Sequence, residues 1–263
     1  MKNLNITLIQ TTLFWEDRPK NLDHFRKLIE RIPQQSDLIL LPEMFNTGYS
    51  INPEFCAEPM DGPSMLFLLE MARSSQAAVA ATLLIMEEGE YVNRLVFYYP
   101  DGTRMTYDKR HLFRLSGEAG IFKGGEERIV IPLKGWKLMP MICYDLRFPV
   151  WSKNRMIAGE YEYDLLFYLS NWPIVRSHAW RALLVARAIE NLSFVAGVNR
   201  IGEDGNGMEH TGDSMVVDPK GLVLYQAPSG EEAVQTITLN YMNLKLFREA
   251  FAFGQDWDTF AIH

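Results

Sequence analysis

Cysteine is scarce in this chain, with only two among 263 residues, Cys56 and Cys143. Two thiols are too few for a disulfide framework, and they suit a reducing compartment in which a reactive thiol survives. We therefore expect a cytoplasmic protein. Cys56 lies in a loop-like segment, residues 50–60, and we expect no function for it.

A net positive charge and long apolar runs are lacking as well. The formal net charge is −7 and the isoelectric point is near 5.3, and no stripe of Lys and Arg is present to neutralise phosphates. A nucleic-acid partner is therefore not expected. No apolar run is long enough to span a bilayer, and the first residues contain no apolar region of signal-peptide length, so we expect no membrane association.

Histidine is also rare, and its spacing argues against a metal centre. The five histidines are His24, His111, His178, His210 and His263. No two of them are four residues apart, which is the helical spacing of a typical zinc pair. We predict no metal site and no cofactor.

What the chain does contain is a hydrophobic fraction of 48% over a length that can bury a substantial core. Strand-like and helix-like segments alternate without a linker or repeat, which predicts one layered α/β domain over residues 1–263. The expected helices span 21–32, 64–73 and 177–191, with another starting at Phe148. The expected strands span 6–10, 37–41, 77–86, 91–99, 103–109, 138–142, 164–169, 193–198, 214–217 and 222–225.

Cys143 stands at the end of a predicted strand, residues 138–142, shortly before Phe148-Pro149. Proline is favoured in the first turn of a helix, so this segment predicts a sharp junction between strand and helix. The positive end of a helix favours a thiolate, which suggests a nucleophile. The alternative is a buried cysteine that acts as a small core residue.

Two other predicted strands also end at a charged side chain. The apolar run 37–41 stops at Pro42-Glu43, where proline forbids a continuing central strand, and the strand from Thr103 ends near Lys109. A carboxylate can take a thiol proton, and an ammonium can stabilise negative charge on a substrate oxygen. Glu43, Lys109 and Cys143 together therefore predict a hydrolytic triad.

These motifs carry a family resemblance. Leu41-Pro42-Glu43, the segment from Tyr107 to Phe113 and the segment from Ile142 to Pro149 resemble, in this order, the carbon-nitrogen hydrolase (nitrilase) superfamily. Two later blocks, 169–173 and 180–191, support the resemblance, which extends from Ile6 to about Gln226. Within the superfamily the cysteine segment is most similar to that of bacterial omega-amidases.

The resemblance implies a four-layer α-β-β-α sandwich and assigns roles within it. Glu43 is then the general base and Cys143 the nucleophile, while Lys109 and the backbone N–H of Tyr144 stabilise the tetrahedral intermediate. Glu118 matches a second glutamate close to the lysine and the substrate. The alternative for Glu118 is an ordinary loop carboxylate in a Gly-rich stretch.

The implied activity is hydrolysis of the terminal amide of short dicarboxylic acid monoamides, such as 2-oxoglutaramate, with a small-molecule amide as the only partner besides a second copy of the chain. Other branches remain open, namely an N-carbamoyl amino acid or polyamine amidohydrolase or a nitrilase. A catalytically silent binding protein is the alternative from another class. A papain-like hydrolase is a mechanistic rival, but the local signature of that family is missing around Cys143. In such a hydrolase His111 or His178 would be the base, but we expect His111 to fix the Lys109 loop and His178 to pack or hydrogen-bond near the site.

A monoamide of a dicarboxylic acid needs a cation for its distal carboxylate, and a guanidinium suits that task. Arg176 is our candidate, with Arg147 as its rival, and Tyr144, Asn171 and Trp172 are expected to contact the substrate as well. The structural alternative for Arg147 is that it ties down backbone carbonyls.

The chain is also expected to form a homodimer. The resemblance implies pairing of two sandwiches, and residues 241–253 are richer in apolar side chains than a simple tail requires. The alternative is that these residues pack on their own domain.

Overall fold

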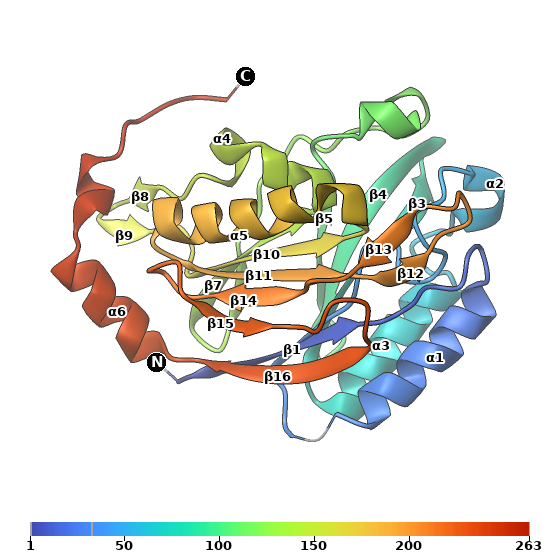
Figure 1. The fold of residues 1–263 in the computed structure, drawn as a ribbon, viewed down its shortest axis with the longest axis horizontal. Coiled ribbons are helices and arrows are strands. Elements are labelled where there is room, and N and C mark those ends of the chain that lie inside the picture. Colours follow the sequence, from blue (N-terminus) through green and yellow to red (C-terminus); the bar gives the residue numbers. More distant parts are fainter. Residues whose placement is uncertain (1, 33, 263) are drawn as a thin grey trace.

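Two six-stranded sheets form the centre of the computed structural model, which describes residues 2–32 and 34–262 (Figure 1). Strands β1, β2 and β3 of the first sheet are parallel, and the other neighbours are antiparallel. The first sheet has the order β16 (Ala233–Leu239), β1 (Leu4–Gln10), β2 (Leu38–Leu40), β3 (Ala78–Glu87), β4 (Glu90–Tyr98) and β5 (Arg104–Asp108).

The second sheet has a parallel centre as well, in which β10 lies between β7 and β11. Its order is β15 (Val223–Gln226), β14 (Met215–Val217), β11 (Phe194–Asn199), β10 (Leu165–Ser170), β7 (Trp136–Ile142) and β6 (Ile131–Leu133). Two hairpins are separate from both sheets, β12 (Ile201–Glu203) with β13 (Glu209–Thr211), and β8 (Met156–Ile157) with β9 (Glu160–Tyr161).

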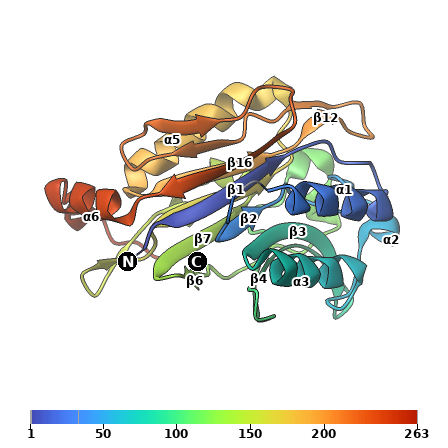
Figure 2. The ribbon, with the colours of Figure 1, turned by 90° about the horizontal axis from the view of Figure 1, so that it is seen from below.

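Helices cover the outer faces of both sheets, α1 and α3 on the first and α5 on the second (Figure 2). The α-helices are α1 (Arg18–Glu30), α2 (Pro53–Cys56), α3 (Pro63–Ser75), α4 (Pro149–Ser152), α5 (Ser177–Asn191) and α6 (Tyr241–Ala250). The 3₁₀ turns are η1 (Arg114–Ser116), η2 (Glu118–Gly120), η3 (Cys143–Arg147), η4 (Ile174–Arg176) and η5 (Phe253–Asp256). The four-layer α-β-β-α sandwich predicted from the sequence is therefore confirmed.

Strand β2 shows why an uninterrupted apolar run forms a central strand here. Its side chains alternate between two cores: Leu38 and Leu40 lie between the sheets, and Ile39 packs under α1 and α3. All three are fully buried, so no polar residue is needed on either face. The strand ends before Pro42, as the sequence predicts, and this places Glu43 beyond the end of the sheet.

Helix α5 lies unusually close to β11 because Gly197 carries no side chain. A Cβ atom at Gly197 would lie 2.6 Å from Leu184 Cδ1 and 2.7 Å from Trp180 Cζ2, both on α5. Contacts this short are not tolerated in a packed interior. The helix ends at Asn191, as predicted, because Leu192 takes the left-handed conformation with φ of 49°.

Several segments differ from the sequence prediction, and the short elements α2, β6, β8, β9, β12 and β13 were not predicted. The helix expected from Phe148 is only the short α4, and the 3₁₀ turn η3 precedes it. The helix stops because the backbone N–H of Asn154 bonds to Asn191 Oδ1, at 2.8 Å, and draws the chain toward the end of α5.

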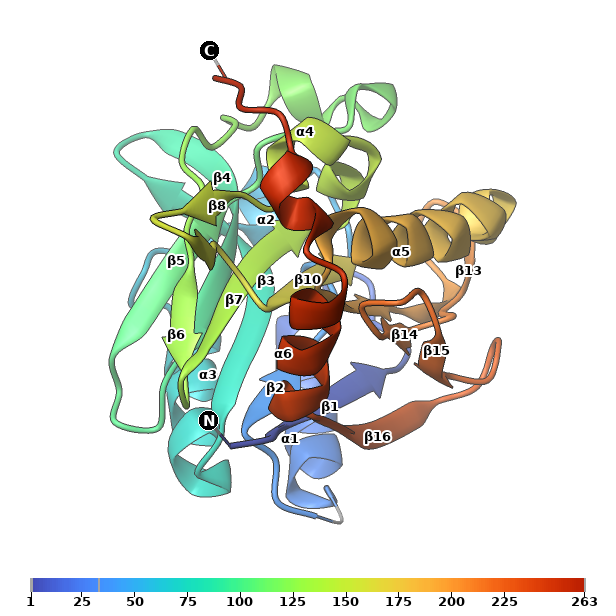
Figure 3. The ribbon, with the colours of Figure 1, turned by 90° about the vertical axis from the view of Figure 1, so that its left-hand side faces the viewer.

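The segment after Tyr225 was predicted without a strand or helix, yet it contains β16 and α6. Strand β16 completes the first sheet by pairing antiparallel with β1, from Leu4 opposite Leu239 to Gln10 opposite Ala233. Helix α6 begins next to the amino-terminal end of the chain (Figure 3), and in its last turn Arg248 pairs with Asp164 at 2.6 Å. None of the described helices is both long and apolar enough to cross a bilayer.

Candidate active site

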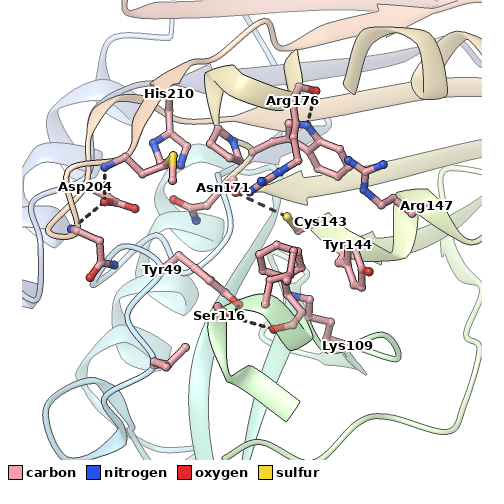
Figure 4. A pocket seen from close by; sticks show the side chains of 17 residues that line it. Tyr49, Lys109, Ser116, Cys143, Tyr144, Arg147, Asn171, Arg176, Asp204 and His210 are labelled. Carbon is pink, nitrogen blue, oxygen red and sulfur yellow. Dashed lines mark hydrogen bonds between the residues drawn. The ribbon is translucent and has the colours of Figure 1, made fainter. Parts of the chain in front are cut away.

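Four strand ends meet at one edge of the sandwich and bring together side chains far apart in the sequence, of which Figure 4 shows Lys109, Cys143 and Asn171. Glu43 follows β2 and Lys109 follows β5 in the first sheet, while Cys143 follows β7 and Asn171 follows β10 in the second. Hydrogen bonds cross between the two sheets here, because the backbone N–H of Asn171 donates to Glu43 Oε2 at 2.9 Å. The three predicted triad residues therefore share one location.

Cys143 is the first residue of η3 and has a φ of 41°, in the left-handed region that non-glycine residues rarely adopt. This conformation turns the chain sharply at the end of β7. The side chain is partly exposed, and its Sγ lies 3.8 Å from the carbonyl oxygen of Asn171. The sharp junction predicted at Cys143 is thus present, although a 3₁₀ turn rather than a long helix forms it.

The electrostatic surroundings of the sulfur differ from the sequence expectation. Burial, followed by the negative charge of Glu43, raises the pKa of the Cys143 thiol well above its usual value, and the nearby Lys109 only partly opposes this. The helix N-terminus that was expected at Cys143 to favour the thiolate is replaced by a short 3₁₀ turn, and burial has the largest effect on the pKa of the thiol. The resting group is a thiol, and it needs a base.

Lys109 lies between two buried carboxylates. Its Nζ is 2.9 Å from Glu43 Oε1 and 3.0 Å from both oxygens of Glu118, and all three side chains are at most 1% exposed. Burial alone would lower the pKa of Lys109, but the charges of Glu118 and then Glu43 raise it well above its usual value. The site therefore holds a permanent ammonium beside the sulfur.

Glu43 is held rigidly by three hydrogen bonds. Oε1 accepts from Lys109 and from Asn93 Nδ2 at 2.9 Å, and Oε2 accepts from the backbone of Asn171. Sequence reasoning missed Asn93. In the sequence it is visible only as a polar residue within the predicted strand 91–99, and the structure buries it fully.

Glu118 contacts the lysine as the resemblance implied, and it is not a solvent-exposed loop carboxylate. Its Oε2 accepts from the backbone N–H of Phe113 at 2.6 Å and from the Tyr49 hydroxyl at 3.0 Å. Burial raises the pKa of Tyr49, so that the phenol remains a donor. Tyr49, which no sequence motif marks, and Ser116, which bonds to it at 2.8 Å, complete the support of Lys109.

A cavity of about 430 Å³ opens above these groups. Its floor consists of Cys143 and Lys109, which line the cavity, together with Glu43 and Glu118, which lie directly behind them. The aromatic side chains of Phe113, Tyr144 and Trp172 line the cavity as well.

Both candidate arginines line the same cavity. The guanidinium of Arg147 lies 4.8 Å from the centre of the Trp172 ring, and that of Arg176 lies 5.3 Å from the centre of the Phe113 ring. Within residues 2–32 and 34–262, neither guanidinium has a hydrogen bond or an ion pair. The expectation that Arg147 ties down backbone carbonyls is therefore not met.

Asn171 and Trp172 line the cavity too, but their polar atoms hold other parts of the site. Asn171 Nδ2 donates to the backbone carbonyl of Glu43, and Trp172 Nε1 donates to the carbonyl of Arg176 at 2.8 Å. Both were predicted as substrate contacts, and in the structure their hydrogen bonds hold the backbone of Glu43 and of Arg176.

A hairpin that sequence reasoning missed forms the opposite side of the cavity. The connection between β12 and β13 brings Asp204, Met208 and His210 to the lining. Asp204 Oδ1 accepts from the backbone N–H of Asn206 at 2.8 Å and of Met208 at 3.0 Å, which closes the turn. Burial, followed by the charge of Arg200, lowers the pKa of His210 to about 4.

The two histidines considered as rival bases do not line the cavity. His178 lies exposed on α5, so the expectation that it packs near the site was wrong. His111 bonds through Nδ1 to Asp145 Oδ1 at 2.7 Å and so lies beside the Lys109 loop, as expected. No cluster of three or more potential metal-ligating side chains occurs in the described part of the chain.

Comparisons with known proteins agree with this geometry. The family model for carbon-nitrogen hydrolases matches residues 5–249. The chain is 41% identical to "Omega-amidase YafV" of Yersinia enterocolitica over 100% of both chains, and 31% identical to "2-oxoglutaramate amidase" of Bacillus subtilis over 88% of each. A solved CN-hydrolase superfamily protein of Xanthomonas campestris, which carries an arsenic adduct in its active site, is 40% identical over the full length of both chains, with a TM-score of 0.98.

Proposed function

The chain belongs to the carbon-nitrogen hydrolase family, and from this premise we propose that it is an omega-amidase acting through the triad Glu43, Lys109 and Cys143. Its substrates are the terminal amides of short dicarboxylic acid monoamides such as 2-oxoglutaramate, and its products are the acid and ammonia. The names of two groups of relatives support this substrate class.

Acylation begins with the transfer of the thiol proton from Cys143 to Glu43. The sulfur attacks the amide carbon, and negative charge develops on the amide oxygen. Lys109 and the backbone N–H of Tyr144 stabilise that charge, since the first N–H groups of a 3₁₀ turn have no partner within the turn. Glu43 then protonates the nitrogen, ammonia leaves, and a thioester remains on Cys143.

Deacylation uses the same groups. Glu43 takes a proton from water as the water attacks the thioester carbon, and Lys109 with the Tyr144 N–H again stabilises the oxyanion. The carbon-sulfur bond breaks, the carboxylic acid is released, and Glu43 returns the proton to the sulfur.

One observation carries this proposal: Cys143 and Lys109 share the floor of a cavity that is also lined, at its rim, by two arginines, and neither guanidinium has a hydrogen bond or ion pair with the described residues. The floor supplies a nucleophile, a base and an oxyanion cation for acyl transfer. The rim supplies positive charge for a distal carboxylate. Arg176 is the proposed carboxylate ligand, and Arg147 is close enough to the same cavity to share that role.

Ammonia release measured across a panel of monoamides, neutral amides, carbamoyl compounds and nitriles tests the function directly. We expect the highest kcat/KM for the monoamides of dicarboxylic acids. A preference for carbamoyl compounds or nitriles would place the enzyme in another branch of the family. The absence of thiol-dependent ammonia release from every compound would favour a binding protein.

We further propose that two copies form a homodimer through α6 and the neighbouring strand β15. Met242 and Leu246 on α6, Leu222 just before β15 and Leu224 within it are 47% to 62% exposed, and Leu224 and Leu246 border the same surface groove. Light scattering after size exclusion should give the mass of a dimer. Leu246→Glu should yield a monomer, and a monomeric wild type would refute the assembly.

A cytoplasmic location is proposed on the state of the two cysteines. Both are free thiols, and the nucleophile role of Cys143 requires that it stay reduced. Cell fractionation with an activity assay tests this location.

A further inference from the structure

Asp145 is a buried carboxylate in which both oxygens are fully used. Oδ2 accepts from the Tyr107 hydroxyl at 2.7 Å and from the backbone N–H of Ile142 at 3.1 Å. Oδ1 accepts from the backbone N–H of His111 at 3.0 Å and from His111 Nδ1 at 2.7 Å. The side chain is 0% exposed, so these four bonds rather than solvent satisfy its two oxygens.

The partners of Asp145 surround the reacting groups. Tyr107 lies two positions before Lys109, and His111 lies two positions after it. Ile142 directly precedes Cys143, and Asp145 itself lies in the turn that Cys143 begins. One carboxylate thus connects the segment of the oxyanion cation, from the first sheet, to the turn of the nucleophile, from the second.

We propose that Asp145 is a positioning residue that fixes Lys109 and Cys143 relative to each other, so that sulfur and ammonium reach the same substrate carbonyl. It touches neither the substrate nor the reacting atoms. It acts by holding Tyr107 and His111 on one side and the amide of Ile142 on the other.

The two side chains that bond to Asp145, Tyr107 and His111, are themselves held in place by further contacts. The Tyr107 hydroxyl also accepts from Trp151 Nε1 at 2.9 Å, and burial raises the pKa of Tyr107 far enough to keep it a donor toward Asp145. The His111 ring stacks on Phe148 with 3.7 Å between centroids and 4° between planes. Because a carboxylate only accepts hydrogen bonds, His111 Nδ1 must carry a proton here.

Asp145→Asn is the sharpest test, because it keeps the shape but replaces one acceptor with an NH₂ group. Whichever way the amide turns, its NH₂ faces a backbone N–H, that of Ile142 or that of His111, so at least one backbone hydrogen bond is lost. A misplacement of about 1 Å at a reacting group lowers turnover by on the order of a hundredfold. We expect kcat to fall by roughly that factor, while KM stays within about twofold because the cavity rim is untouched.

The matched control is Asp164→Asn. Asp164 is likewise buried, and it accepts from the backbone N–H of Lys137 at 3.0 Å and from Arg248 at 2.6 Å, but it precedes β10 and so lies at the opposite end of the strand from Asn171. Both variants lose a buried ionic acceptor and should unfold more easily. Only Asp145→Asn should lose kcat at temperatures where both remain folded.

The inference rests on the proposed function, so a second readout is independent of it. The rate at which iodoacetamide alkylates Cys143 needs no substrate, and it should fall at least several-fold in Asp145→Asn and stay unchanged in Asp164→Asn. If the wild type releases no ammonia from any amide, the proposed function fails, and alkylation still tests the positioning role.

Tyr107→Phe covers the case in which Asp145→Asn does not fold. It removes one of the four bonds and should lower both kcat and the alkylation rate by a smaller factor, on the order of tenfold for a lost bond of this kind. The proposal is overturned if folded Asp145→Asn or Tyr107→Phe keeps wild-type kcat and alkylation rate, or if Asp164→Asn loses as much of both.

Discussion

Charged side chains are paired at the floor of the cavity and, among the described residues, unpaired at its rim, which is formed by Arg147, Arg176 and the β12–β13 hairpin. At the floor, the ammonium of Lys109 lies between Glu43 and Glu118, and every charge has a partner within 3.0 Å. At the rim, the guanidinium groups of Arg147 and Arg176 rest on aromatic rings and have no anionic partner in the described part of the chain. The floor is complete before substrate arrives, whereas the rim still has positive charge to offer it.

This difference follows from what each region must do. Transition-state charge is stabilised best by groups that need no rearrangement, and buried charges are tolerated only when they are paired. A carboxylate-binding rim must instead remain unpaired until the ligand binds. Substitutions at the floor should therefore lower kcat and stability, and substitutions at the rim should change KM and selectivity.

The largest expected effect concerns the nucleophile. Cys143→Ala should fold and lose all measurable turnover, because no other group at the floor can form the thioester. Cys56→Ala is the matched control and should keep wild-type activity, since Cys56 is fully buried in a separate cluster with Met44 and Phe122. Ammonia release measures both. If alkylation of Cys56 rather than Cys143 abolishes activity, the nucleophile is misassigned.

The next effect separates the two duties of the floor lysine. Lys109→Met should lower kcat by about 10²–10³, the usual loss for one oxyanion donor. It should also lower the free energy of unfolding by about 3–5 kcal/mol, because Glu43 and Glu118 then face each other without a cation. Steady-state kinetics and urea denaturation measure the two losses.

A double variant sharpens this result. Lys109→Met with Glu118→Gln removes one of the two opposed carboxylates, so part of the lost stability should return. Activity should not return with it. If turnover recovers together with stability, Lys109 stabilises the fold and has no catalytic role. The floor would then differ from the rim in stability alone.

The floor could be predicted from the sequence because strand ends mark it. Glu43, Lys109 and Cys143 each follow a buried run, and the ends of neighbouring strands lie at one edge of a sheet. What the sequence did not reveal was how the groups are held. Tyr49 belongs to no motif, and Asp145 was visible only as part of a motif, since its four bonds connect segments that only the fold brings together.

The rim and the carboxyl-terminal third were harder to predict. Strand β16 has partly exposed and exposed residues along most of its length, so it carries a weak hydrophobic signal and depends on pairing with β1. The β12–β13 hairpin is held by a turn around Asp204, which is local hydrogen bonding rather than an apolar pattern. Helix α5 was predicted to the residue because its apolar face is long.

At the rim, Arg176→Met should weaken binding of the distal carboxylate. A lost charge-assisted hydrogen bond is worth about 1.5–3 kcal/mol, which raises KM for 2-oxoglutaramate by on the order of tenfold to a hundredfold. A neutral amide of similar length should be hydrolysed as before. Arg147→Met, tested in parallel, shows whether the two guanidinium groups share the ligand.

The proposed role of the rim depends on a selective loss of activity toward the carboxylate-bearing amide in Arg176→Met. An equal loss for the carboxylate-bearing and the neutral amide would make Arg176 part of the scaffold. A larger effect of Arg147→Met than of Arg176→Met would exchange their roles but leave a cationic rim in place.

The smallest expected effect is a pH dependence of the free energy of unfolding that comes from His210 in the β12–β13 hairpin. His210 is 5% exposed, and its pKa in the folded protein is lowered to about 4, by burial first and then by Arg200, while Asp204 opposes the shift. In the unfolded chain His210 takes up a proton near its ordinary pKa of 6.5, and in the folded chain it does not. Stability is therefore complete above about pH 6.5 and falls as the pH drops toward 4. Each unit is worth about 1.4 kcal/mol, so the free energy of unfolding should fall by about 2 kcal/mol between about pH 7 and pH 5.

Urea denaturation at these two pH values measures the contribution of His210. His210→Gln cannot take up the proton and should lose most of that fall, whereas His178→Gln, at an exposed position on α5, should keep it. Because the floor residues Glu43, Lys109 and Glu118 lie on other elements, their ion pairs should not respond to the His210 substitution. If His210→Gln keeps the wild-type pH dependence, the acid sensitivity arises elsewhere, and the rim is as insensitive to acid in this range as the floor.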